Sequence, residues 1–161
     1  MGKSLTGNES GIGIKSGILN INGAHVVCDG ADKTPTEGYN NGIKPSGATI
    51  QIESNNGYAG NIEINISNGN FESKNSNVIY EYIGKGNQSL INSMSISGGI
   101  FKSGDSKDVF SLSNSFKDIH SGFISGGEYS TDPSNYLKNG YSKVNDGNMY
   151  KVIKSTLKNA V

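Results

Sequence analysis

The sequence predicts an all-β fold built as a solenoid, in which short strands coil around a narrow core. A six-residue phrase with apolar ends occurs four times, at residues 21–26 (INGAHV), 66–71 (ISNGNF), 96–101 (ISGGIF) and 124–129 (ISGGEY). Successive phrases begin 45, 30 and 28 residues apart, with a second apolar segment in each interval. Strands that return at such a period without helices between them are typical of solenoids.

Each phrase is expected to form the corner of a coil. Its first apolar residue ends one strand, the small residues bend the chain, and its last apolar residue begins another strand. Glycine and asparagine suit the bend because they tolerate a left-handed backbone. Residues 62–66 (IEINI) alternate apolar and polar side chains, as a strand with one buried face does. The second apolar segments, at residues 48–52, 78–82 and 109–112, are too short for ordinary helices.

Composition limits the classes of function. The chain has 161 residues, 23 of them glycine, and its formal net charge of zero argues against disorder. All 14 basic residues are lysine. Recognition of phosphates and base edges usually relies on the planar fork of arginine, so we expect no nucleic-acid partner.

The apolar pattern and the single cysteine bear on the setting of the chain. No apolar run approaches the roughly 20 residues of a membrane span, so no membrane insertion is expected. The first ten residues lack the apolar region of a signal peptide, which permits a cytoplasmic protein and equally fits a piece of a longer secreted chain. The strand pattern that begins at once at residues 11–14 (GIGI) favours the second. Cys28 stands alone, so we expect a small buried hydrophobic side chain there and no internal disulfide.

Two polar excursions, at residues 29–47 and 53–61, interrupt the predicted coil, and rigid scaffolds often carry binding residues on such loops. Aromatic rings beside planar amides are suited to sugars. The candidate ligand-binding residues are Tyr39, Asn41, Asn55 and Tyr58 on these loops, and Tyr80 and Tyr82 on the coil surface. The alternative is that these side chains only support turns, and that the loops cover an open hydrophobic edge.

The end of the chain predicts a cap. Asp132 followed by Pro133 is a helix-start signature, which predicts one helical turn that covers the last coil with Tyr136 and Leu137. Residues 141–152 then read as a hairpin with a glycine turn, which would protect the terminal edge. The predicted organisation is a flexible lead-in at 1–10, coils at 11–130, a cap at 131–153 and a tail or linker at 154–161.

The four phrases, together with residues 130–137 (STDPSNYL), the Gly140-Tyr141 step and the Asp-Gly hairpin, resemble a known family. The resemblance is to the pectate-lyase-like right-handed parallel β-helix domains of large secreted or surface proteins of gut Firmicutes and their phages, and it covers residues 11–152. It implies that fold, an extracellular or cell-surface setting with a phage particle as the other option, and an adhesive or glycan-directed role. It brings no catalytic residues with it.

The residues themselves predict no catalytic, metal or cofactor site. Polysaccharide lyases on this kind of fold generally use a strong base, often arginine, beside an acidic calcium cluster. The closest acidic pairs here are Asp29 with Asp32 and Asp105 with Asp108, in turns where aspartate commonly bonds the backbone. Neither His25 nor His120 has a partner at metal-ligand spacing.

These observations predict a non-catalytic extracellular module that serves in adhesion, in glycan binding or as a spacer within a larger surface protein. The first alternative is a polysaccharide lyase or hydrolase that depends on Asp105 or Asp108. The second is a self-assembling or phage-tail structural module whose N-terminal coil stacks on another chain. The expected partner is a glycan or a host surface.

Overall fold

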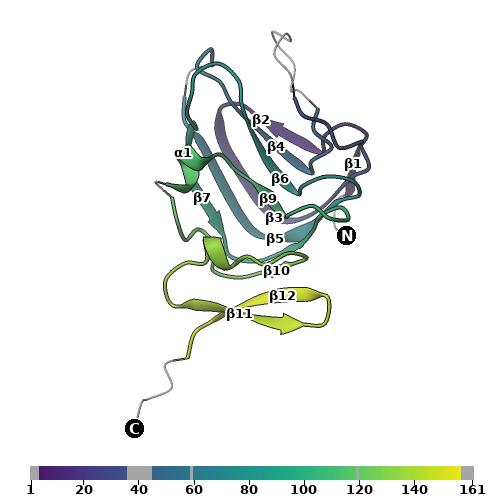
Figure 1. Cartoon of the computed structure of the whole chain (residues 1–161), viewed down its shortest axis with the longest axis vertical. Coiled ribbons are helices and arrows are strands. Elements are labelled where there is room, and N and C mark those ends of the chain that lie inside the picture. Colours follow the sequence, from purple (N-terminus) through teal and green to yellow (C-terminus); the bar gives the residue numbers. More distant parts are fainter. Residues whose placement is uncertain (1–3, 36–44, 59, 119, 157–161) are drawn as a thin grey trace.

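The computed structural model describes residues 4–35, 45–58, 60–118 and 120–156, and nearly all of its regular structure is β (Figure 1). One sheet, here called sheet A, contains eight strands: β1 (Ser4–Gly7), β3 (Gly17–Cys28), β5 (Ile62–Ser73), β7 (Ile91–Ile96), β8 (Ile100–Lys102), β10 (Glu128–Tyr129), β11 (Tyr141–Asp146) and β12 (Met149–Lys154). The other, sheet B, contains four: β2 (Ile12–Ile14), β4 (Ile50–Ser54), β6 (Ile79–Ile83) and β9 (Phe110–Ser111). The predicted all-β class is confirmed.

From β1 to β10 the chain passes back and forth between the two sheets, with β7 and β8 following one another in sheet A, and every strand pair within this part is parallel. Sheet A curves around one side of the molecule in β3 and β5, while the strands of sheet B cross the opening (Figure 1). Each repeat of the sequence therefore adds a strand to both sheets, directly beside the strand of the previous repeat. Parallel strands need such long crossover connections, because a tight turn joins only antiparallel strands.

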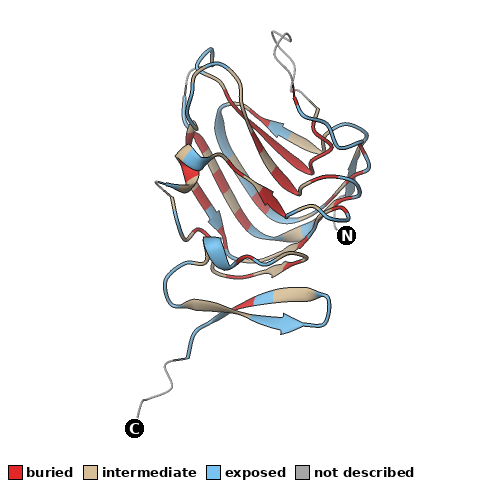
Figure 2. Cartoon of the chain, viewed as in Figure 1, coloured by how far each residue is buried: buried red, intermediate tan, exposed pale blue. Residues whose placement is uncertain are grey.

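The core consists of like side chains stacked from one repeat to the next. Val26, Phe71, Phe101 and Tyr129 are register partners in sheet A and are all buried. The rings of Phe71 and Phe101, and those of Phe101 and Tyr129, stack with centroids 5.0 Å apart in both cases. Figure 2 shows the buried stretches on the strands of both sheets, whereas the C-terminal hairpin is mostly exposed. Isoleucines form a second stack at Ile21, Ile66, Ile96 and Ile124.

The repeated phrase separates two strands, as predicted, only in the later repeats: β7 ends at Ile96 and β8 begins at Ile100, whereas β3 and β5 each run through their phrase. Pairing of β3 with β5 continues through the phrase, with register shifts around Asn22. In the last phrase Gly127 has φ 97°, a conformation that favours glycine. A Cβ atom at Gly126 would lie 2.2 Å from the Ser97 carbonyl oxygen, so the close approach of the two repeats requires glycine there as well.

Two short elements of the structure were not predicted from the sequence. Ser4–Gly7 forms β1, in register with His25 to Cys28, where a flexible lead-in was expected. Parallel pairing supplies hydrogen bonds to a segment that has little apolar pattern of its own. The short helix α1 (Asn114–Lys117) was not predicted either.

A buried carboxylate holds α1 against sheet B. Glu81 is 6% exposed; its Oε1 accepts a hydrogen bond from the Ser54 hydroxyl at 2.7 Å, and its Oε2 accepts one from the Ser113 backbone N–H at 3.0 Å. Ser113 is the N-cap of α1, and its hydroxyl oxygen accepts from the Phe116 N–H. Both carboxylate oxygens are thus satisfied inside the molecule, as a buried charge requires.

The C-terminal segment follows the predicted cap closely. A 3₁₀ turn, η1 (Ser134–Tyr136), starts one residue later than expected, with Pro133 at its N-cap position. Tyr136 packs its ring against Phe110 and Phe123, with centroids 5.1 and 5.2 Å away. Strands β11 and β12 then form the hairpin around Gly147, and β12 pairs antiparallel with β10. No helix in the described part of the chain is long and apolar enough to span a membrane.

Asp132 ties this cap together. Its Oδ1 accepts from the Ser134 N–H at 2.9 Å, and its Oδ2 pairs with the Lys143 ammonium group. These contacts, with Lys143 the largest cause and Ser134 the next, lower the pKa of Asp132 to about 2. The carboxylate therefore contributes stability above its ordinary pKa, and this contribution is lost as the pH falls from about 4 to about 2.

We expect Asp132→Asn to lower the free energy of unfolding at pH 7 by less than about 1 kcal/mol, because both charged groups are substantially exposed. Asparagine can still accept from Ser134, so the substitution isolates the charge. Urea unfolding at pH 7 and at pH 2 measures the difference, which should shrink toward zero at the lower pH. An equal difference at both values would contradict this role for the charge.

Candidate functional site

The outer face of sheet B brings several of the predicted site residues together. Tyr80 and Tyr82 of β6 lie beside Gln51 and Glu53 of β4 in the parallel register. Asn55 and Tyr58 follow β4 directly, and a Lys15–Glu53 ion pair links the loop after β2 to the same strand. We call this group the tyrosine face; its members are Lys15, Glu53, Asn55, Tyr58, Tyr80 and Tyr82.

Glu53 is the centre of the tyrosine face. Its side chain is 1% exposed, and its Oε1 lies 3.3 Å from the Lys15 ammonium nitrogen and 3.5 Å from the Asn55 amide nitrogen. Its Oε2 is buried and has no hydrogen-bond partner among the described residues. Lys15 also donates to the Tyr58 hydroxyl at 3.2 Å and lies 4.5 Å from the centre of that ring. The carboxylate is therefore neutralised by one cation that a tyrosine holds in place.

Gln51 extends the polar row along β4. It is fully buried, its Oε1 accepts a hydrogen bond from the Ser46 hydroxyl, and its Nε2 has no hydrogen-bond partner in the described part of the chain. Tyr80 lies beside it, and burial, then the charge of Asp32, then Tyr82 raise the pKa of the Tyr80 hydroxyl. The Tyr80 hydroxyl is thus a neutral donor and acceptor at physiological pH.

The predicted site residues divide into three groups. Tyr80 and Tyr82 are half-buried on one strand face, where the sequence places them. Asn55 and Tyr58 lie near them, but Asn55 also closes a turn, since its Oδ1 accepts from the Gly57 N–H at 2.8 Å. Tyr39 and Asn41 lie outside the described residues. Asn55 therefore does two things. It supports a turn, as the alternative interpretation of the sequence expected, and it also lies on the tyrosine face.

Sequence reasoning missed Lys15, Gln51 and Glu53. The alternation of residues 50–53 (IQIE) puts Gln51 and Glu53 on one face of a strand, which was a usable signal. No sequence signal pointed to Lys15, because its proximity to Glu53 depends on the register between β2 and β4.

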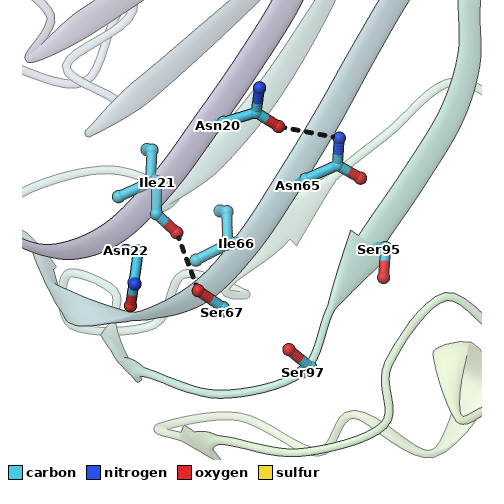
Figure 3. Close-up of a pocket in the computed structure, with 8 residues that line it drawn as sticks. All are labelled: Asn20, Ile21, Asn22, Asn65, Ile66, Ser67, Ser95 and Ser97. Carbon is cyan, nitrogen blue, oxygen red and sulfur yellow. Dashed lines mark hydrogen bonds between the residues drawn. The ribbon is translucent and has the colours of Figure 1, made fainter.

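A second polar surface lies on sheet A. A shallow pocket of about 190 Å³ is lined by Asn20, Ile21, Asn22, Asn65, Ile66, Ser67, Ser95 and Ser97 (Figure 3). These residues lie on β3, β5 and β7, apart from Ser97, which directly follows β7. We call this the Asn/Ser pocket. No sequence prediction singled it out, although polar residues recur at the same outward position in three repeats.

The acidic pair Asp105 and Asp108 and the two histidines lie on different elements. Asp105 and Asp108 are exposed in the loop after β8, where residues 103–108 line a cavity of about 420 Å³ with Ser130 and Thr131. His25 is exposed on β3, and His120 stacks on Phe116 with ring centroids 5.1 Å apart. Among the described residues, no three histidine, cysteine or acidic side chains are grouped so that they could hold a metal ion.

Comparison with known proteins identifies no relative of this chain. No family model, no curated protein and no solved structure matches the chain.

Proposed function

We propose that this chain is a module of a right-handed parallel β-helix that binds glycans through its tyrosine face and serves adhesion in a larger surface protein. The alternation of parallel strands between two sheets, and the side-chain stacks that run from repeat to repeat, support the helix. The right hand follows from the strong preference of parallel crossovers for that hand. An extracellular or cell-surface setting follows from the family resemblance of the phrases and the cap.

One observation carries the proposal for glycans, namely the gathering of three tyrosines around a neutralised carboxylate. Tyr80 and Tyr82 come from β6, whereas Tyr58 follows β4 and is placed by Lys15. Sugar rings pack on aromatic faces through their C–H groups, and their hydroxyls bond amide and carboxylate oxygens. The face offers half-buried tyrosine rings and the Asn55 amide, while the buried Glu53 carboxylate holds Lys15 and Asn55 from beneath. These groups lie on or beside paired strands, so little conformational entropy is lost when a ligand binds.

The test is a glycan array followed by calorimetry on the best ligand. We expect Tyr80→Ala combined with Tyr82→Ala to weaken binding at least about tenfold, because two ring contacts are removed. The matched control is Tyr150→Ala, which removes a half-buried tyrosine from the hairpin, away from sheet B.

Thermal unfolding of each variant separates a lost site from a lost fold. Equal affinities of the double variant and the parent chain, with both folded, would assign the binding to another surface. If no glycan on the array binds, the glycan-binding role is contradicted and the role as a spacer is favoured.

A further inference from the structure

The Asn/Ser pocket on sheet A is independent of the tyrosine face and differs from it in chemistry. Its polar lining consists of three amides and three hydroxyls, and the residues that line it carry no charge. Asn20 and Asn65 are register partners on β3 and β5, and Asn65 pairs in turn with Ser95 on β7. Neighbouring strands lie about 4.8 Å apart, so these three side chains form an evenly spaced row across the sheet.

Much of the hydrogen-bonding capacity in this pocket is unused. The Asn65 amide nitrogen donates to Asn20 Oδ1 at 3.0 Å, and the Ser67 hydroxyl donates to the Ile21 carbonyl at 3.4 Å (Figure 3). The first bond leaves the Asn20 amide nitrogen and the Asn65 amide oxygen available. Asn22, Ser95 and Ser97 are exposed and make no side-chain hydrogen bond to another described residue. The pocket therefore presents donors and acceptors in similar number.

The framework beneath these side chains is rigid. Ile21 and Ile66 are buried in the isoleucine stack, directly beside Asn20 and Asn65 in sequence. Strands β3 and β5 pair with each other on both sides of the pocket, with register shifts around Asn22, and β5 also pairs with β7. The amide-to-amide bond fixes the orientation of both asparagine planes, so a ligand meets groups that are already in place.

The chemistry of the lining side chains determines which classes of ligand fit the pocket. A charged group would give up hydration without meeting an opposite charge, which is costly. An apolar group would leave the amides and hydroxyls unpaired. An extended peptide adds to a sheet through backbone hydrogen bonds at a strand edge, whereas the lining of this pocket consists of side chains on the face of the sheet. An uncharged molecule rich in hydroxyl groups satisfies the lining in every respect.

We propose that the Asn/Ser pocket is a binding site for one ring of a neutral, hydroxyl-rich saccharide. The volume of about 190 Å³ is below that of drug-sized sites, which fits a single ring better than a long chain. The ring hydroxyls bond Asn22, Asn65 and Ser95, while the next unit of an oligosaccharide extends across the strands in the direction of the row.

The experiment is NMR titration of the ¹⁵N-labelled chain with neutral di- and trisaccharides, and with uronic-acid oligosaccharides of equal length. We expect the side-chain amide signals of Asn20, Asn22 and Asn65 to shift with at least one neutral saccharide, and to stay unchanged with the acidic ones. Asn65→Leu, nearly equal in shape, should weaken this binding about tenfold. Asn145→Leu in the exposed hairpin is the matched control and should leave it unchanged.

The result is separable from the proposed role of the tyrosine face. The variant with Tyr80→Ala and Tyr82→Ala should keep the shifts of the pocket amides, because the two surfaces lie on different sheets. Unshifted pocket amides with all neutral saccharides would overturn the inference, whatever the array shows. Equal shifts with acidic oligosaccharides, or an unchanged affinity in a folded Asn65→Leu variant, would overturn it as well.

Discussion

Phe101→Ala is expected to lower the free energy of unfolding by about 3–5 kcal/mol, the range for the loss of a fully buried phenylalanine. Phe101 is fully buried and stacks on Phe71 on one side and Tyr129 on the other, with 5.0 Å between centroids in each pair. The cavity would lie between two repeats that are each held by their own strand pairing, so it cannot collapse easily. Urea unfolding followed by circular dichroism measures the loss.

Two controls frame this result. Ile18 is 62% exposed on β3, and Ile18→Ala should change stability by less than about 0.5 kcal/mol. Phe101→Leu fills part of the cavity and should fall between the two. A loss below about 1.5 kcal/mol for Phe101→Ala would mean that the aromatic stack does not hold the repeats together.

Lys15→Met should destabilise the fold by about 3 kcal/mol, because it removes the only cation seen at a buried carboxylate in the described part of the chain. Glu53 is 1% exposed and Lys15 13% exposed, and their charged atoms are 3.3 Å apart. Loss of one partner of a buried pair leaves the other charge without compensation, which typically costs 3–5 kcal/mol. The Asn55 amide, 3.5 Å from Glu53, offsets part of this cost.

The double variant Lys15→Met with Glu53→Gln tests the cause. Removal of both charges should restore at least half of the lost stability, since no uncompensated charge remains. The two single variants and the double variant form a cycle that isolates the coupling between the side chains. Additive losses would show that Lys15 acts through the packing of its methylene stem.

The parts of the fold that were predictable are those in which the local pattern and the final environment agree. Residues 62–66 alternate because Ile62, Ile64 and Ile66 all enter the core from one face of β5. Strand β1 was not predictable, because its pairing with His25 to Cys28 gives the segment an order that its own composition does not. The handedness and the helical closure of the coil rest on the resemblance and on general preferences, and they remain predictions.

The site was predictable to a smaller extent for a similar reason. Residue type and strand position placed Tyr80 and Tyr82 on the coil surface, and the structure puts them together on one face of β6. The pairing of Lys15 with Glu53 depends on the length of the intervening excursion, which no local pattern determines. The Asn/Ser pocket arises from residues in three repeats, so only the register makes it visible.

The contact between Gly126 and the Ser97 carbonyl has an evolutionary consequence. Gly98 approaches the Ser67 carbonyl in the same way, so the contact recurs after one repeat. A duplication or deletion of the repeat that leads from Gly98 to Gly126 preserves this contact, whereas a shift of a few residues within these two phrases places a side chain where only the hydrogen atom of a glycine fits. The length of this molecule can therefore evolve in steps of about one repeat, and insertions of other sizes are confined to the loops between the strands.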